Sequence, residues 1–149
     1  MSGQPLTIRP LEASDEAAWR RLWGLYQRFY AVDLSEEVHR STWARLLDPA
    51  EPVNGALALI DGAPVGLVHY IWHRTCWDIA DSCYLQDLYV EEGTRGAGVG
   101  AALIAYVRGQ ADARGVAVVH WLTHEDNHRA RRLYDHVARR SGFIQYRRS

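Results

Sequence analysis

The stretch YVEEGTRGAGVGAALIAYV, residues 89–107, ends an apolar strand-like run and begins a helix-like one. Between the two lie three glycines within five residues, at positions 96, 98 and 100. Glycine loses more backbone entropy on folding than any other residue, so this cluster indicates that bare backbone is needed there. Backbone N–H groups at the start of a helix form a site for phosphate groups. The stretch therefore predicts a phosphate-binding loop or, failing that, a glycine-rich turn.

Three phosphate ligands fit this loop to different degrees. A Walker loop for a nucleoside triphosphate ends in Gly-Lys-Ser/Thr, and the chain has no lysine, so this ligand is excluded. Residues 96–101 match the dinucleotide pattern G-x-G-x-x-A, but the next apolar stretch does not end in an acid that would bind a ribose. A dinucleotide fold would also place this loop near its start. A pyrophosphate carried by another cofactor needs no such acid, and Arg95 would add a cation beside it.

The composition is that of a soluble single domain, with 149 residues, of which 48% are hydrophobic and 23% charged. No apolar run approaches the roughly 18 residues of a membrane span, and the first residues lack a signal-peptide layout. We therefore expect a cytoplasmic protein with no membrane or nucleic-acid partner.

Residues 1–90 carry 7 arginines against 12 acidic residues, whereas residues 91–149 carry 10 arginines against 6 acidic residues. This division suits an anionic ligand at the glycine loop and a cationic one near the acidic half.

Hydrophobic periodicity predicts one mixed α/β domain over residues 1–149, with a central mixed sheet flanked by helices. The expected order is β-α-α-β-β-β-α-β-α-β. Asp61-Gly62 indicates a two-residue hairpin. The strands are expected at residues 5–9, 56–60, 65–72, 82–90, 116–123 and 143–146, and the helices at 14–30, 35–47, 98–114 and 126–140.

Two motifs in the second half of the chain occur in the order and spacing of a single known family. Residues 95–100 match Gln/Arg-x-x-Gly-x-Gly/Ala, five residues after a strand end, and a second unit carries Asn127, Ala130, Leu133-Tyr134 and Gly142-Phe143. In type, order and spacing this segment, residues 84–146, resembles the GNAT superfamily of acetyl-CoA-dependent N-acetyltransferases. The end of the chain is especially similar to the branch of yeast histone and D-amino-acid N-acetyltransferases. The strand and loop are also similar to those of spermidine/spermine N-acetyltransferases.

The resemblance implies acetyl-CoA as co-substrate, a primary amine of a small molecule or peptide as acceptor, and a homodimer in which residues 143–146 form an exchanged edge strand. It implies that Leu88 N–H stabilises the thioester oxygen, that the strand through Tyr89 and Val90 pairs with the pantetheine arm, and that Tyr134 protonates the departing thiolate. The cofactor-binding residues expected on this basis are Leu88, Tyr89, Val90, Arg95, Gly96, Gly98, Val99, Gly100, Ala101, Asn127 and Ala130. An ordinary central strand and a core tyrosine are the structural alternatives for Leu88 and Tyr134.

The general base and the acceptor pocket are less well marked. Polyamine-type members have a glutamate where this chain has Gln86, and glutamine takes no proton. Asp87, Glu125, His120 or a chain of water molecules are the alternatives. Tyr30 and the aromatic loop 72–77 are candidates for the acceptor pocket. Substrate contacts are therefore expected from Gln86, Asp87, Glu125 and Tyr30.

Metal chemistry finds no support in the sequence. His120, His124 and His128 are four residues apart, but they run across a strand end, a turn and a helix start. Cys76 and Cys83 have neither zinc spacing nor enough partners for a disulfide framework. Two functions thus remain beside the dinucleotide domain: an N-acetyltransferase, and a non-catalytic acyl-CoA-binding or regulatory module suggested by the missing glutamate. The sequence does not identify the acceptor.

Overall fold

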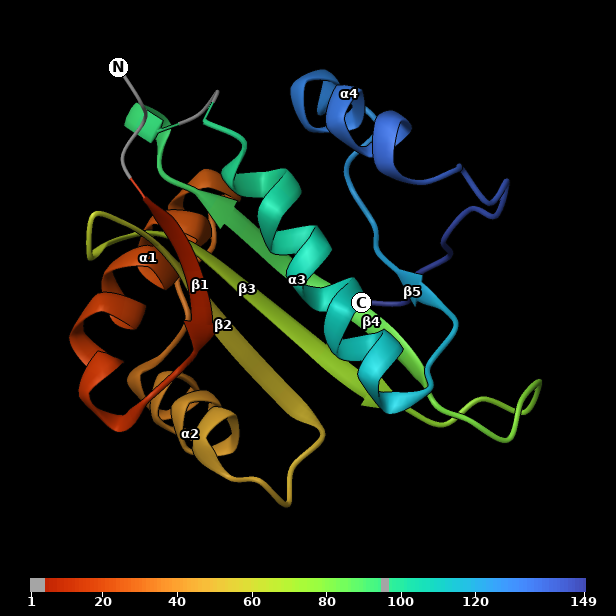
Figure 1. Cartoon of the computed structure of the whole chain (residues 1–149), viewed down its shortest axis with the longest axis horizontal. Helices are drawn as coiled ribbons and strands as arrows, with labels where there is room; N and C mark the ends of the chain where they lie inside the picture. The colour runs from red at the N-terminus through yellow and green to blue at the C-terminus, as the bar shows by residue number, and fades with distance from the viewer. Residues whose placement is uncertain (1–4, 95–96) are drawn as a thin grey trace.

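One five-stranded sheet forms the centre of the computed structural model, which describes residues 5–94 and 97–149 (Figure 1). Its strand order is β1-β2-β3-β4-β5. The first four strands are antiparallel neighbours, and β5 pairs parallel to β4. The strands are β1 (Leu6–Pro10), β2 (Val53–Ile60), β3 (Ala63–His73), β4 (Ser82–Val90) and β5 (Val119–His120). The expected mixed α/β fold is confirmed.

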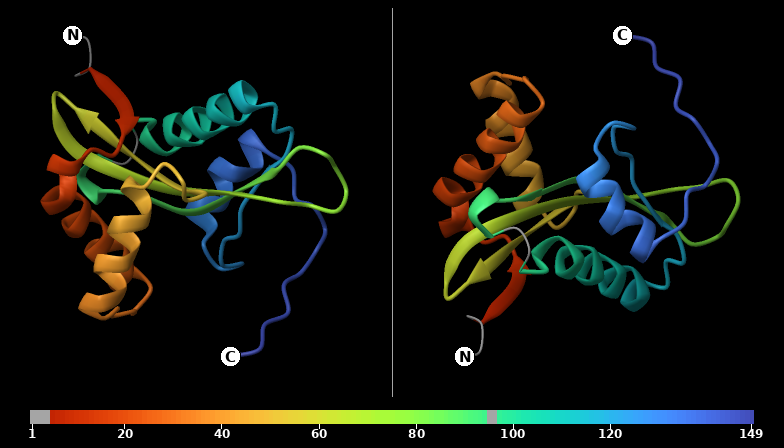
Figure 2. Two further views of the ribbon diagram at one scale, coloured as in Figure 1. Left: turned by 90° about the horizontal axis from the view of Figure 1, so that it is seen from below. Right: turned by 90° about the horizontal axis from the view of Figure 1, so that it is seen from above.

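Helices cover both faces of this sheet (Figure 2). One face packs against α1 (Glu16–Phe29) and α2 (Glu36–Leu47), and the other against α3 (Val99–Arg114), with α4 (His128–Val137) beside it. Two short 3-10 turns, η1 (Ala13–Asp15) and η2 (Glu92–Thr94), precede α1 and the glycine loop. None of the helices in residues 5–94 and 97–149 is long and apolar enough to cross a membrane.

Each face has its own apolar core, because the strand side chains alternate between the two helical layers. The core under α1 and α2 is built from Trp19, Leu22, Trp43, Leu46, Leu57, Leu59 and Leu67. The core under α3 contains Val68, Tyr70, Cys83, Leu85, Leu103 and Ile104, among others. The β2–β3 hairpin has the predicted two-residue turn: Asp61 and Gly62 both have positive φ, of 52° and 80°, as the twist-matched turn requires.

Strand β4 contains a bulge at Gln86. In its register with β3, Asp87 lies opposite His69 and Leu85 lies opposite Tyr70, so Gln86 has no counterpart. The extra residue changes which face the following side chains take. Leu85 and Leu88, three residues apart, both pack on the α3 side, whereas Asp87 contacts His69 on the α1 side. Without the bulge, Asp87 would face the same layer as Leu85.

The C-terminal third departs from the predicted elements. β5 has only two residues instead of the eight at 116–123, and Val118 and Leu122 are each 55% exposed rather than covered. Residues 143–146 form no strand: Phe143 is 91% exposed and Tyr146 is 88% exposed. A strand needs a hydrogen-bonding neighbour, and this segment extends away from the sheet (Figure 2). Helix α4 ends at Val137, three residues before the predicted end, because Ala138 is extended.

Candidate active site

A cavity of about 560 Å³ opens between the second half of β4, the start of α3, the helix α4 and the end of α1. Its walls come from segments far apart in the sequence, which the mixed sheet brings to one edge. Most of the residues that the motifs single out line it. They are Leu88, Tyr89, Val90, Gly98, Val99, Gly100, Ala101, Asn127, Ala130 and Tyr134, joined by Tyr26, Phe29, Tyr30, Arg129 and Leu133.

The start of α3 forms the first wall. Gly98 is the N-cap with φ 77°, a left-handed conformation that favours glycine. The next residues begin the helix, and their N–H groups have no acceptor within it because of helix geometry. A Cβ atom on Gly100 would come within 3.1 Å of the Leu133 side chain, so glycine here lets Leu133 of α4 pack directly against α3. This bare, positively polarised helix end fits a pyrophosphate. Arg95 and Gly96 lie outside the described residues.

The second half of β4 forms the second wall. β5 pairs with β4 at Cys83 and Tyr84, and the pairing stops there. The two strands then separate, and Figure 1 shows β5 leading away toward α4 while β4 continues toward α3's first turn. Leu88, Tyr89 and Val90 therefore lie along the cavity while still paired with β3 on their other side. An extended ligand arm fits beside such a strand.

Helix α4 forms the third wall. Asn127 is its N-cap, and its side-chain oxygen accepts from Ala130 N–H at 3.3 Å. Tyr134, two turns further on, packs edge-on against Trp121 with ring centroids 5.6 Å apart. Burial raises the pKa of Tyr134 to about 12, with a smaller contribution from Tyr30. The phenol therefore keeps its proton at neutral pH and is available as an acid.

An aromatic rim from the end of α1 closes the cavity. Tyr26, Phe29 and Tyr30 line it, and the rings of Tyr26 and Tyr30 lie edge to face with centroids 5.0 Å apart. Burial, and then interaction with Asp87, raise the pKa of Tyr26 well above its ordinary value. Sequence reasoning chose Tyr30 and left Tyr26, one helical turn earlier, among the aromatic residues of 19–30 that are more often core.

The remaining candidate polar residues lie in different surroundings. Asp87 is mostly buried, and its Oδ2 lies 2.9 Å from His69 Nδ1. Gln86 is exposed at the bulge, and Glu125 is exposed with its backbone oxygen bound by Arg131. His120 stacks on Tyr84 and contacts His73, outside the cavity. Of the candidate bases and substrate contacts, Tyr30 therefore belongs to the aromatic rim, and Asp87 interacts with Tyr26 of that rim.

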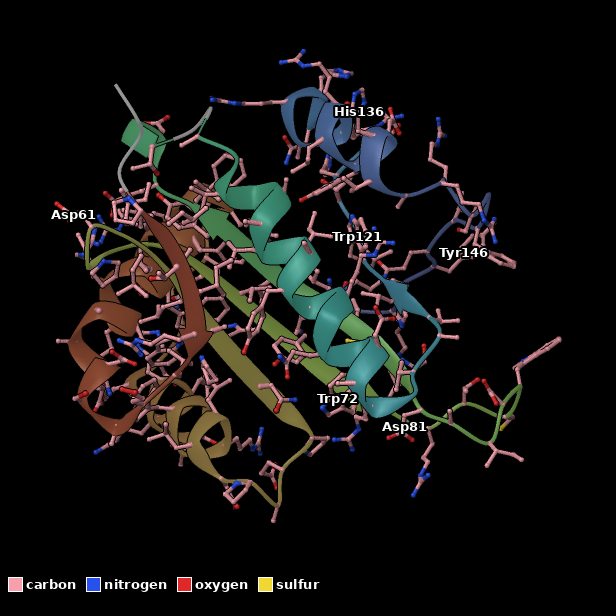
Figure 3. All side chains as sticks on the ribbon, viewed as in Figure 1. Asp61, Trp72, Asp81, Trp121, His136 and Tyr146 are labelled. Carbon is pink, nitrogen blue, oxygen red and sulfur yellow. The ribbon has the colours of Figure 1, made fainter. Side chains whose placement is uncertain are left out.

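The proposal that loop 72–77 lines the acceptor pocket is wrong. Trp72 is buried under the far end of α3 with the guanidinium of Arg114 over its ring, and Figure 3 shows it away from α4. Trp77 is 96% exposed. The loop joins β3 to β4 at the end of the sheet opposite to the cavity, which aromatic content alone does not reveal.

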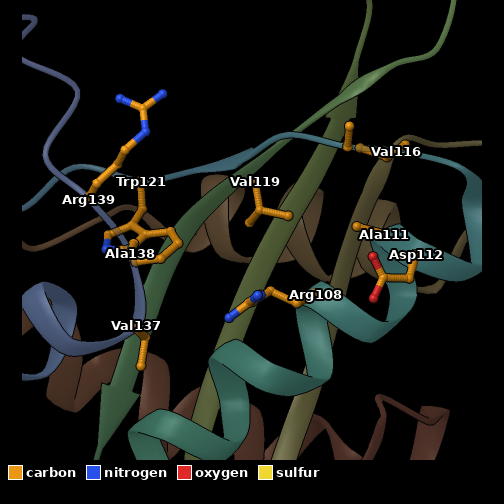
Figure 4. A pocket seen from close by; sticks show the side chains of 10 residues that line it. Arg108, Ala111, Asp112, Val116, Val119, Trp121, Val137, Ala138 and Arg139 are labelled. Carbon is orange, nitrogen blue, oxygen red and sulfur yellow. The ribbon is translucent and has the colours of Figure 1, made fainter.

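A second hollow, of about 400 Å³, lies between the last turns of α3, β5 and the end of α4 (Figure 4). Val119, Trp121 and Val137 give it an apolar side, and Arg108, Asp112 and Arg139 a polar one. Its walls contain none of the motif residues. Within the described residues, no three His, Cys, Asp or Glu side chains are grouped so as to hold a metal ion.

Comparison of the chain with known proteins identifies the family to which it belongs. A family model described as the acetyltransferase (GNAT) family matches residues 19–138. The chain belongs to the GNAT acetyltransferase family. The family match and a named N-acetyltransferase relative that covers the whole chain make the protein an acetyl-CoA-dependent N-acetyltransferase that acts on an amine. The dinucleotide-domain hypothesis is wrong, and the finding favours an enzyme over a non-catalytic acyl-CoA module.

The relatives extend over the whole chain. D-amino-acid N-acetyltransferase HPA3 of Saccharomyces cerevisiae is 38% identical over 151 residues, covering 100% of this chain and 94% of that protein. The solved aminoglycoside N-acetyltransferase AAC(6')-Iy, in complex with CoA, superposes with a TM-score of 0.85 at 18% identity, covering 99% of this chain and 97% of that one. Ribosomal-protein-alanine N-acetyltransferase from Brucella melitensis gives 0.81 at 19% identity, covering 97% and 99%. These two structures support the fold alone.

Proposed function

We propose that this N-acetyltransferase acetylates the amino group of a small amino acid, with D-amino acids as the first acceptors to test. The observation that carries the proposal is the single cavity that joins a phosphate-binding helix start, an open strand edge, a protonated tyrosine and an aromatic rim. The 38% identical relative, named as a D-amino-acid N-acetyltransferase, supports the choice of acceptor.

Acetyl-CoA, when bound, supplies an activated acetyl group as a thioester. On the protein side, the N–H groups of Val99, Gly100 and Ala101 would bind its pyrophosphate, with Arg95 and Gly96 before them and Gly98 giving close access. Leu88 N–H would donate to the thioester oxygen as negative charge develops on it. Tyr89 and Val90 would hold the pantetheine arm along the strand, and Asn127 and Ala130 would face it from α4. The uncapped helix start and the lining of the cavity support these roles.

Two side chains would handle protons. The amine nitrogen forms a bond to the carbonyl carbon while the C–S bond breaks. An acceptor that arrives as an ammonium loses two protons from nitrogen, one before the attack and one as the amide forms, while one proton joins the sulfur, so one proton is released to water. Asp87 would attract the acceptor ammonium and take the first proton, either directly or through water. Tyr134 would give a proton to the sulfur, and its raised pKa supports this because the phenol stays protonated at neutral pH until the sulfur departs. Tyr26 and Tyr30 would enclose the acceptor, with Gln86 and Glu125 further out.

The test is an acceptor panel with acetyl-CoA, following thiol release. The panel holds both enantiomers of several amino acids, spermidine, an aminoglycoside and a basic peptide. D-amino acids are expected to give the highest kcat/KM. Asp87→Asn should lower kcat/KM for the acceptor and leave the KM for acetyl-CoA within about twofold. A wild-type enzyme that prefers polyamines or peptides would refute the acceptor class, and a fully active Asp87→Asn would refute the role of Asp87.

We further propose that the protein is a homodimer in the cytoplasm. Residues 139–149 are exposed and form no helix or strand, and the large side chains of Phe143 and Tyr146 on this segment are uncovered; Figure 3 labels Tyr146. β5 is the last strand of the sheet, and the exposed Val118 directly precedes it. Pairing of residues 143–146 with the corresponding edge of a second copy would cover both, because an exposed apolar edge favours association. Two free cysteines, one of them exposed, suit a reducing compartment.

Light scattering on the full chain and on a chain ending at Ser141 tests the dimer. The full chain should have twice the monomer mass, and the shortened chain should be monomeric at the same concentration. A monomeric full chain would refute the homodimer. Fractionation of cells that express the protein tests its location.

A further inference from the structure

His69 is a buried polar residue in the middle of β3, next to the acceptor side of the cavity. It is 3% exposed, and both ring nitrogens have partners. Trp19 Nε1–H donates to His69 Nε2 at 3.0 Å, and His69 Nδ1 lies 2.9 Å from Asp87 Oδ2. Asp87 is also the cross-strand partner of His69 in the sheet. The imidazole therefore bridges a tryptophan of the core and a carboxylate of the site.

The tautomer of His69 follows from its partners. An indole nitrogen only donates, so His69 Nε2 must accept with its lone pair. Nδ1 then carries the ring hydrogen and donates it to Asp87. A hydrogen on Nε2 would face the indole N–H, so His69 is arranged to hold Asp87 rather than to pass protons on. Its geometry is that of a support.

The surroundings keep this support rigid. Trp19 is fully buried, and its ring lies 5.0 Å from that of Trp43 and 6.3 Å from the imidazole of His69. Trp23 packs edge-on against His69 with centroids 4.8 Å apart, and its ring stacks on Tyr26 at 5.4 Å. Close packing of this kind fixes a side chain in one rotamer. The orientation of the Asp87 carboxylate is thereby set from inside the core.

Asp87 connects this support to the reacting end of the cavity. Tyr26 interacts with both Asp87 and Tyr30, and Tyr30 acts electrostatically on Tyr134. The path therefore runs from Trp19 through His69 and Asp87 to the aromatic rim and the candidate acid. Misplacement of a catalytic group by about 1 Å is enough to cost a large part of the rate.

We propose that His69 is a positioning residue for acetyl transfer: its Nδ1–H fixes the Asp87 carboxylate toward the acceptor amine, and Trp19 fixes the tautomer that makes this possible. The inference rests on the role of Asp87 proposed above. A purely structural histidine would matter for stability but would not distinguish the acceptor from acetyl-CoA in the kinetics.

The first test compares His69→Asn with His69→Leu. An Asn carboxamide places an N–H near the position of Nδ1, whereas Leu has similar bulk and no donor. His69→Leu should lower acceptor kcat/KM by about tenfold to hundredfold, as expected for a lost hydrogen bond to a charged group, with the KM for acetyl-CoA unchanged. His69→Asn should restore most of this loss. His73→Asn, on the same strand but outside the cavity, is the matched control and should behave as wild type.

The second test needs no catalysis. In the 15N spectrum of the unliganded enzyme, His69 should appear as a single tautomer with the hydrogen on Nδ1. Trp19→Phe keeps an aromatic ring but removes the indole N–H, so the spectrum should shift toward the other tautomer and acceptor kcat/KM should fall. A wild-type His69 with its hydrogen on Nε2 would overturn the proposal.

The outcomes separate this inference from the proposed function. If the wild type acetylates no amine, the proposed function fails and the positioning role fails with it. If Asp87→Asn is impaired but His69→Leu is not, only the positioning role is overturned. Equal loss in His69→Asn and His69→Leu would also overturn it, because bulk and not the donor would then be responsible.

Discussion

The two halves of β4 differ in what lies beside them. At residues 82–85, β3 pairs on one side and β5 on the other, and Cys83 and Leu85 are sealed in the core under α3. At residues 87–90, the pairing with β5 has ended, and the side chains border the cavity. The bulge at Gln86 separates the two halves.

This contrast shows how one half of an ordinary strand comes to line the cavity. Departure of the neighbouring strand opens space along the backbone, and the bulge turns one carboxylate from the α3 layer to the α1 layer. Neither change requires an unusual residue at the position itself. The closed half keeps the strand in place, while the open half carries the residues that line the cavity and are proposed to bind and react. Changes at the open half should therefore affect kinetics, and changes at the closed half should affect stability and accessibility.

Tyr134→Phe should have the largest effect, at the open half. Loss of the phenol hydroxyl removes the proposed acid, and kcat should fall by about 10²- to 10⁴-fold. The KM for acetyl-CoA and the melting temperature should change little, since the ring still packs against Trp121. Steady-state kinetics at neutral pH measure this. A variant with unchanged kcat would mean that Tyr134 is only a packing residue.

The two cysteines test the closed half. Burial raises the pKa of the Cys83 thiol to about 11, which disfavours the reactive thiolate, whereas Cys76 is exposed in the loop before β4. A thiol reagent at pH 8 should modify Cys76 at once and Cys83 about a thousandfold more slowly, because Cys83 reacts only after the strand opens. Mass spectrometry of the labelled peptides follows both. Equal rates would show that β5 does not seal this end.

Gly100→Ala tests the wall between α3 and α4. The added Cβ lies 3.1 Å from the Leu133 side chain, so that side chain, which lines the same cavity, must move. The KM for acetyl-CoA should rise by about tenfold while the helix itself remains. Gly109→Ala is the matched control on the same helix, since a Cβ there meets nothing within 4 Å. It should stabilise the fold by up to about 1 kcal/mol without changing the kinetics. The same kinetics in both variants would contradict the close approach at Gly100.

His120 gives the smallest effect, again at the closed half. Burial, and then His73, lower the pKa of His120, so the folded state binds fewer protons than the unfolded state just below the ordinary pKa of 6.5. The contribution of neutral His120 to the free energy of unfolding is therefore present above pH 6.5 and is lost as the pH falls through the folded-state pKa. Urea unfolding of wild type and His120→Asn at several pH values should show a shallower loss below pH 6.5 in the variant. If the free energy of unfolding falls equally with pH in wild type and His120→Asn, the lowered pKa of His120 does not contribute to stability.

The sequence could predict which residues of α3 and α4 line the cavity, on the side proposed to bind acetyl-CoA, because local patterns encode them. A glycine cluster before a helix, and Asn127, Ala130 and Tyr134 on one helical face, depend only on neighbours in the chain. On the acceptor side, Asp87 and Tyr30 were candidates from the sequence, but the side chains that contact Asp87 could not be predicted in this way. Tyr26, Trp19 and His69 belong to periodic apolar or alternating stretches that read as ordinary core, and their contact with Asp87 depends on a register shift that no residue type signals.

By itself, then, the sequence determined the order of elements through residue 115, the hairpin at Asp61-Gly62 and the start of α3 at Gly98-Val99, since propensity, turn chemistry and spacing are local. The sequence pattern predicted eight residues for β5, where the structure has two, and a last strand at residues 143–146, where the structure has none. Both predictions failed because a strand forms only beside a hydrogen-bonding partner. Only the tertiary structure decided that β5 leaves β4 after Tyr84, that the bulge turns Asp87 toward His69, and that Trp19 completes the support. These features depend on pairing between distant segments, and pairing is a property of the folded sheet rather than of any single stretch of chain.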